Sequence, residues 1–154
     1  MDPLTISIGV GLLVGLVFVS FLGLSTGGMV VPGYFALEMG HPAVLLVTIM
    51  ASLLIYIFVK LLSLFLIIYG RRRIAITVLL SFIVGVIMNK ILHGYSIQVL
   101  LNDDIHVIGY IVPGLIALAI DRQGVIETIG SLLIASVFIR LILIIIIGPQ
   151  IIGI

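Results

Sequence analysis

Few residues of this chain have the types and spacing that chemistry needs. Cysteine is absent from the 154 residues, which excludes a thiolate metal site, a disulfide framework and a cysteine nucleophile. The histidines His41, His93 and His106 are too far apart for the paired ligands of an H-E-x-x-H zinc site, and no phosphate-binding G-x-x-x-x-G-K-[ST] loop occurs. No serine has an adjacent His–Asp partner set. We therefore expect no catalytic residues and no metal or cofactor in this chain.

The composition indicates which elements hold the few polar residues. Hydrophobic residues make up 63% of the chain and charged residues 8%, whereas soluble domains are about 25% charged. A soluble domain of this length lacks the interior to bury so much apolar surface, and disorder requires the opposite composition. The net charge of +1 argues against nucleic-acid binding. The sequence therefore predicts a protein that uses the lipid bilayer as its solvent.

Four apolar runs are long enough to cross a bilayer, for which a helix needs about 20 residues. They cover residues 4–24, 43–69, 74–92 and 125–147. Two further apolar stretches, 29–37 and 105–120, are short or interrupted by Pro-Gly, and a polar turn is expected at 121–124. The first run lacks the features of a removable signal peptide. The predicted fold is an all-α integral membrane protein with about four transmembrane helices.

The two halves of the chain resemble each other. Residues 28–33 (GMVVPG) recur as 109–114 (GYIVPG) at an offset of 81, and 58–60 (FVK) recur as 138–140 (FIR) at an offset of 80. We predict one membrane domain, 1–154, built from repeat 1 (about 4–69), an arginine loop (70–73) and repeat 2 (about 74–147). Two crossings per repeat make the repeats parallel. Their interface is either a pathway or binding surface, or purely architectural.

Small residues mark two special features of the spans. Pro32-Gly33 and Pro113-Gly114 predict a turn or a break in a helix. Each pair is either a re-entrant element lining a wet cavity or the corner of a type II turn at the outer surface. Their matched positions favour a functional or assembly-critical role. Gly11 and Gly15 are spaced so that a second helix can approach closely, although glycine is also common in membrane helices.

Basic residues set the predicted orientation and supply the binding candidates. The positive-inside rule places Arg71, Arg72 and Arg73 in the cytoplasm, together with both chain termini. These arginines either set topology and contact anionic lipid, or dock a cytoplasmic partner or polyanion. Lys60 and Arg140 lie within spans, where ionisable residues suggest function, although each can also snorkel to the interface. Five of the seven basic residues thus lie inside.

Three blocks of sequence resemble the PgsC/CapC family. They are residues 28–34 (GMVVPGY), residues 69–73 (YGRRR), and residues 111–117 (IVPGLIA) continuing to Gln123-Gly124. Their order and spacing match over nearly the whole chain, as does a length of about 150 residues. The linker between the repeats and the tail at 148–154 depart from the family pattern.

The resemblance implies a multi-pass subunit of the poly-γ-glutamate synthesis and export machinery in a prokaryotic cell membrane. Such a subunit works with an ATP-dependent amide ligase (PgsB/CapB) and a membrane-anchored accessory subunit (PgsA/CapA). The ligase is expected to hold the ATP and divalent metal, so this chain is expected to be a non-catalytic subunit. One chain is small for a polymer path, so a homo-oligomer or hetero-complex is expected. The alternative is a small transporter or channel subunit for another anionic substrate.

Overall fold

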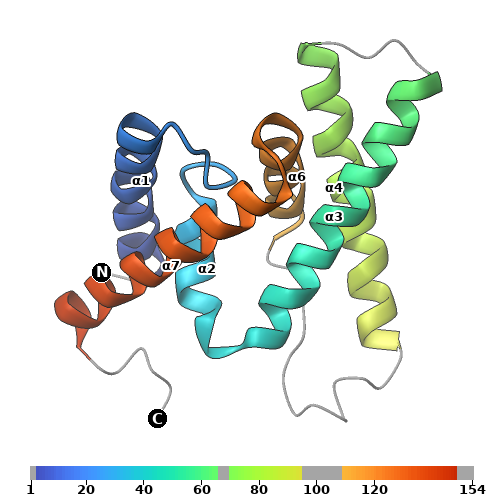
Figure 1. The fold of residues 1–154 in the computed structure, drawn as a ribbon. Coiled ribbons are helices and arrows are strands. Elements are labelled where there is room, and N and C mark those ends of the chain that lie inside the picture. The colour runs from blue at the N-terminus through green and yellow to red at the C-terminus, as the bar shows by residue number, and fades with distance from the viewer. Residues whose placement is uncertain (1–2, 66–69, 95–108, 149–154) are drawn as a thin grey trace. The chain divides into compact units, whose positions relative to one another are not determined.

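The computed structural model describes residues 3–65, 70–94 and 109–148, and every regular element in these ranges is helical (Figure 1). The elements are α1 (Pro3–Leu22), α2 (Val31–Leu37), the 3-10 helix η1 (Glu38–Gly40), α3 (Pro42–Phe65), α4 (Arg71–Gly94), α6 (Val112–Gln123) and α7 (Val125–Ile147). In α3, α4 and α7 the described residues are long and apolar enough to cross a membrane, and Thr5–Phe21 of α1 forms a shorter apolar helix. The predicted all-α membrane fold is therefore confirmed.

Two expected loops are parts of helices. The arginine loop predicted at 70–73 is a single turn residue, Gly70 with φ 62°, followed by α4, which begins at Arg71. The polar turn predicted at 121–124 reduces to Gly124, because residues 121–123 complete α6. Gly124 has φ 102°, a conformation that side chains disfavour, so it can separate two consecutive helices. Arginine and glutamine are good helix formers, which explains why polarity alone was a poor guide to these ends.

The Pro-Gly pairs begin helices. Pro32 occupies the first turn of α2, and Pro113 is the second residue of α6. Proline is well suited to this position, since the missing N–H has no helical partner there and its fixed φ is already helical. Neither Gly33 nor Gly114 has a positive φ, so the type II turn is wrong. The positive φ angles occur earlier, at Gly27, Gly28 and Gly109.

The chain divides into two compact units. The first comprises Met1–Pro42 and Ala119–Ile154, and the second comprises Ala43–Leu118. In the first unit α7 packs against both α1 and α2 (Figure 1). The second unit holds α3, α4 and the first part of α6. Each unit thus combines the first and the short helix of one predicted repeat with the last helix of the other. The single domain and the repeat bounds stay predictions; the end of repeat 1 lies outside the described residues.

The cores of the two units use corresponding positions in the sequence. The first core contains Ala36, Ile139 and Leu143, with Ile6, Val10, Val14 and Leu37 against it. The second contains Ile55, Val59 and Ala117, with Tyr56, Leu80 and Val84 against it. Ala36 corresponds to Ala117 by the offset of 81, and Val59 corresponds to Ile139 by the offset of 80. Helices α1 and α4 correspond by an offset of 70, which relates Val10 to Leu80 and Val14 to Val84.

Candidate functional site

A clamp of small residues holds the start of α2 against α1. Ser7 Oγ donates a hydrogen bond to the Gly33 carbonyl oxygen at 2.7 Å. A Cβ at Gly33 would lie 2.8 Å from the Ser7 carbonyl oxygen, and a Cβ at Gly11 would lie 3.0 Å from Gly33 Cα. One turn further along α1, a Cβ at Gly15 would lie 3.1 Å from Met29 Cα. The two backbones therefore meet at distances that leave no room for side chains.

An equivalent clamp joins α4 to the start of α6. Ser81 Oγ donates to the Tyr110 carbonyl oxygen at 2.7 Å and accepts from the Gly114 N–H at 2.8 Å. A Cβ at Gly114 would lie 2.6 Å from Ser81 Cβ, and one at Gly85 would lie 3.0 Å from Tyr110 Cδ1. The Tyr110 ring also makes an edge contact with Phe82, with 5.6 Å between the ring centroids.

The sequence predicted the close packing at Gly11 and Gly15 of α1 but not the equivalent contacts of α4. Positions 7, 11 and 15 of α1 correspond to Thr77, Ser81 and Gly85 of α4 by the offset of 70. Both stripes repeat a small residue every fourth position, which places the three on one helix face. The signal for the second stripe was the same spacing, with Ser81 in place of the glycine at position 11. Both Pro-Gly pairs are buried, and their glycines, Gly33 and Gly114, bring the backbone of the short helices close to these stripes.

A second polar cluster, missed by sequence reasoning, joins the loop before α2 to the α6–α7 junction. Gln123 Oε1 accepts from the Ser25 N–H at 2.7 Å, and Nε2 donates to the Ser25 carbonyl oxygen at 2.5 Å. Nε2 also donates to Thr128 Oγ1, and Ser131 Oγ donates to the same Ser25 carbonyl oxygen. The side-chain amide of Gln123 therefore satisfies both backbone groups of Ser25, and we call this pair of hydrogen bonds the amide clamp.

The two basic residues at matched positions have different surroundings. Arg140 in α7 is partly buried, and Nη1 donates to the Ala36 carbonyl oxygen at 3.3 Å. That carbonyl lies in the last turn of α2, where carbonyls lack helical partners and a positive charge suits the helix dipole. Lys60 in α3 is exposed, and Nζ lies 3.3 Å from Tyr56 Oη and 5.5 Å from the ring centroid. The two residues belong to different units.

The three arginines occupy the first turn of α4. Arg71 and Arg72 are exposed, and Arg73 is half-buried. Positive charge at a helix N-terminus opposes the helix dipole, which costs each residue about 0.3–1 kcal/mol at an exposed site. Helix stability therefore does not account for these arginines. Arg71–Arg73 and Lys60 fall in one unit and Arg140 in the other.

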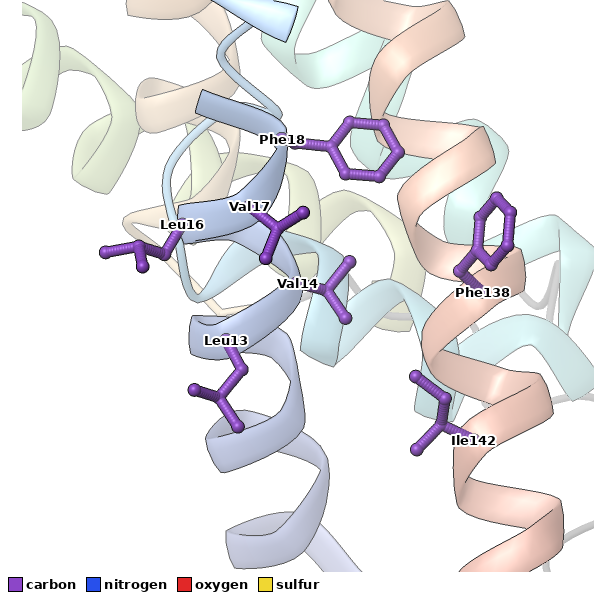
Figure 2. A pocket seen from close by; sticks show the side chains of 7 residues that line it. All are labelled: Leu13, Val14, Leu16, Val17, Phe18, Phe138 and Ile142. Carbon is purple, nitrogen blue, oxygen red and sulfur yellow. The ribbon is translucent and has the colours of Figure 1, made fainter. Parts of the chain in front are cut away.

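Each unit carries an apolar groove between two of its helices. The groove of the first unit, about 410 Å³, lies between α1 and α7 and is lined by the seven side chains in Figure 2. Val14, Val17 and Phe18 point toward α7, from which Phe138 and Ile142 project (Figure 2). The groove of the second unit, about 380 Å³, is lined by Leu54 and Phe58 of α3 and by Leu80, Ile83, Val84, Ile87 and Met88 of α4.

The described part of the chain holds no cluster of three or more His, Cys, Asp or Glu residues that could bind a metal ion. His106 and the side chain of His93 lie outside the described residues. Each unit therefore holds a backbone clamp, basic side chains and an apolar groove, and the first unit also holds the hydrogen bonds of Gln123. Such an arrangement can pack helices and attract anions.

Comparison with known proteins assigns the family. Residues 10–129 match the model of the capsule biosynthesis CapC family. The chain is 37% identical over 136 residues to the PGA biosynthesis protein CapC of Bacillus subtilis (strain 168), covering 88% of this chain and 89% of that protein. It is 39% identical over 138 residues to the capsule biosynthesis protein CapC of Bacillus anthracis, with the same coverage. No solved structure matches. The chain therefore belongs to the capsule biosynthesis CapC family.

Proposed function

We propose that this chain is the multi-pass membrane subunit of a poly-γ-glutamate synthase and export complex. It anchors and assists an ATP-dependent amide ligase and passes the anionic polymer across the membrane. Its partners are a PgsB/CapB-like ligase and a PgsA/CapA-like accessory subunit. The observation that carries the proposal is the family match over most of the chain, since both relatives are named for capsule or PGA biosynthesis.

The arginines at the start of α4 supply the positive charge that the proposed function requires. Poly-γ-glutamate carries one carboxylate per residue, and a guanidinium can bind a carboxylate through two parallel hydrogen bonds. Arg71 and Arg72 are exposed at a helix N-terminus, so the helix dipole adds to their positive potential. We propose that they receive the nascent polymer or dock an acidic surface of the ligase, with Arg73, Lys60 and Arg140 as further contacts.

The clamped Pro-Gly helices provide a rigid frame for this role. Backbone contacts between α1 and α2, and between α4 and α6, leave little freedom for sliding. We propose that these short helices shape the outer exit of the polymer path. Both chain termini then face the cytoplasm together with Arg71–Arg73. Because the chain has no cysteine, single-cysteine variants at residues 72 and 122 can report this orientation by their labelling from each side.

The decisive test pairs charge removal with a matched control. Arg71→Gln with Arg72→Gln should abolish polymer output or ligase co-purification, while membrane levels of the chain remain normal. The control, Lys90→Gln with Arg122→Gln, removes two other exposed charges and should leave output unchanged. Normal output from the arginine variant would refute this role for the arginines. Charge-dependent flux of another anion without any ligase would favour the transporter alternative.

A further inference from the structure

One basic residue, Arg73, lies on the same stripe of α4 as residues that line the groove between α3 and α4. Arg73, Thr77, Leu80, Val84 and Ile87 follow one another at spacings of four, three, four and three residues. Residues spaced in this way lie along one stripe of a helix. The last three line the groove of the second unit. Arg73 thus lies about 10 Å along the helix axis from the groove at Leu80.

The other two arginines lie off this stripe. Successive helix residues are rotated by about 100°, so Arg72 is displaced to one side of the stripe and Arg71 to the far side of α4. Arg73 is half-buried, whereas its two neighbours are exposed. Arg73 therefore lies on the stripe of α4 that lines the groove, whereas the exposed Arg71 and Arg72 lie off this stripe.

The groove of the first unit provides an internal comparison. Its Val14, Val17 and Phe138 correspond to Val84, Ile87 and Phe58, so both grooves have similar apolar linings. By the same offset of 70, Arg73 corresponds to Pro3, which is uncharged. The two grooves therefore agree in apolar lining, and the basic residue at position 73 has no basic counterpart at the matched position 3.

We propose that the α3–α4 groove binds one anionic phospholipid, with an acyl chain in the groove and the phosphate at Arg73. Arg73 lies about 10 Å along the helix axis from the groove at Leu80, and the headgroup zone of each leaflet is about 5–7 Å thick. A phosphate in the headgroup zone can therefore lie near Arg73 while its acyl chain lies in the groove. The first groove accepts acyl chains without selecting their headgroup.

The lining of the groove favours a lipid over the other occupants. Carboxylates of a polymer would lose their hydration in a groove without polar groups. A partner helix packs most closely against small residues in a membrane, whereas this groove is lined by Leu, Ile, Val, Met and Phe. A flexible acyl chain can fill such a surface, and the charge at its end matches that of Arg73.

The test measures lipid retention by the full chain, without ligase or polymer. The purified protein is given equal amounts of phosphatidylglycerol and phosphatidylcholine with the same acyl chains, and bound lipid is counted by native mass spectrometry. We expect phosphatidylglycerol to be preferred about fivefold, the factor that one basic residue near an anionic lipid supplies. Arg73→Gln should abolish the preference, and Arg72→Gln should retain it. Inorganic phosphate should not displace the lipid, since the acyl chain also contributes.

A groove-filling variant tests where the acyl chain lies. Ile83 is 45% exposed on the groove, so Ile83→Trp should fold and reduce bound phosphatidylglycerol. Leu13→Trp fills the corresponding position of the first groove and should leave the preference unchanged. The role of Arg73 is overturned if Arg73→Gln retains the preference for phosphatidylglycerol, or if Arg72→Gln loses it equally. The binding of a lipid in the groove is overturned if phosphate alone displaces the lipid, or if Ile83→Trp binds phosphatidylglycerol normally. Because no polymer is measured, this outcome is independent of the proposed function.

Discussion

Replacing Gly33 with alanine tests the clamp between α1 and α2. The added Cβ would lie 2.8 Å from the carbonyl oxygen and 3.3 Å from the carbonyl carbon of Ser7. Both atoms are backbone of a long helix, so relief requires α1 and α2 to separate. Inserting a methyl group into such a packed contact costs about 1–3 kcal/mol.

Two smaller terms modify this cost. Separating the helices also weakens the hydrogen bond from Ser7 Oγ to the Gly33 carbonyl oxygen, and such bonds in membranes average about 0.6 kcal/mol. Alanine favours the helix over glycine by at most about 1 kcal/mol. With the full helix-propensity gain subtracted, the net expectation for Gly33→Ala is a loss of about 0.6–2.6 kcal/mol. For a chain of this size, that loss lowers the melting temperature by roughly 1–10 °C.

The assay is thermal unfolding of the purified chain in detergent, followed by circular dichroism. Gly9→Ala is the matched control, because it lies in α1 and nothing lies within 4 Å of its added Cβ. We expect the control to melt at or slightly above the temperature of the unmodified chain. The reasoning is refuted if Gly33→Ala melts no lower than the unmodified chain, or if Gly9→Ala loses as much.

Three further substitutions test the other contacts. Ser81→Ala leaves the buried Gly114 N–H without its acceptor and should cost about 1–3 kcal/mol in the same assay; an unchanged melting temperature would contradict the second clamp. Gln123→Leu removes three hydrogen bonds and should cost about 2 kcal/mol. Gln123→Glu should not restore stability, because glutamate lacks the N–H donor of the amide. Full stability of Gln123→Glu would exclude the amide clamp. Arg140→Met should lower stability more than Lys60→Met, because Arg140 bonds to the end of α2 and Lys60 is exposed; equal effects would argue against that difference.

The long helices were predictable because the bilayer imposes a length on each apolar run. The expected spans began or ended within a few residues of α1, α3, α4 and α7 wherever the ends are described. The start of α4 was missed, since three arginines were interpreted as a loop although arginine is a good helix former. The type II turn was wrong for a related reason, because proline serves both the second position of a turn and the first turn of a helix.

The contacts between distant segments were beyond the reach of local patterns. Nothing in the sequence of α7 indicates that it packs with α1 and α2 of the other predicted repeat. Gln123 belongs to a block that resembles the PgsC/CapC family, but its bonds to Ser25 span 98 positions. The spacing of Gly11 and Gly15 predicts close packing of helices, whereas Ser81 fills the same role with a small hydroxyl side chain that a pattern of glycines does not detect.

Reconstitution with the ligase tests the central claim most directly. The chain is co-expressed with a PgsB/CapB-like ligase, membranes are solubilised, and the ligase is assayed for ATP- and glutamate-dependent polymer with and without this chain. The account predicts that the two proteins purify together and that polymer forms only when the chain is present. Full polymer synthesis and export in a strain that lacks this chain would contradict it.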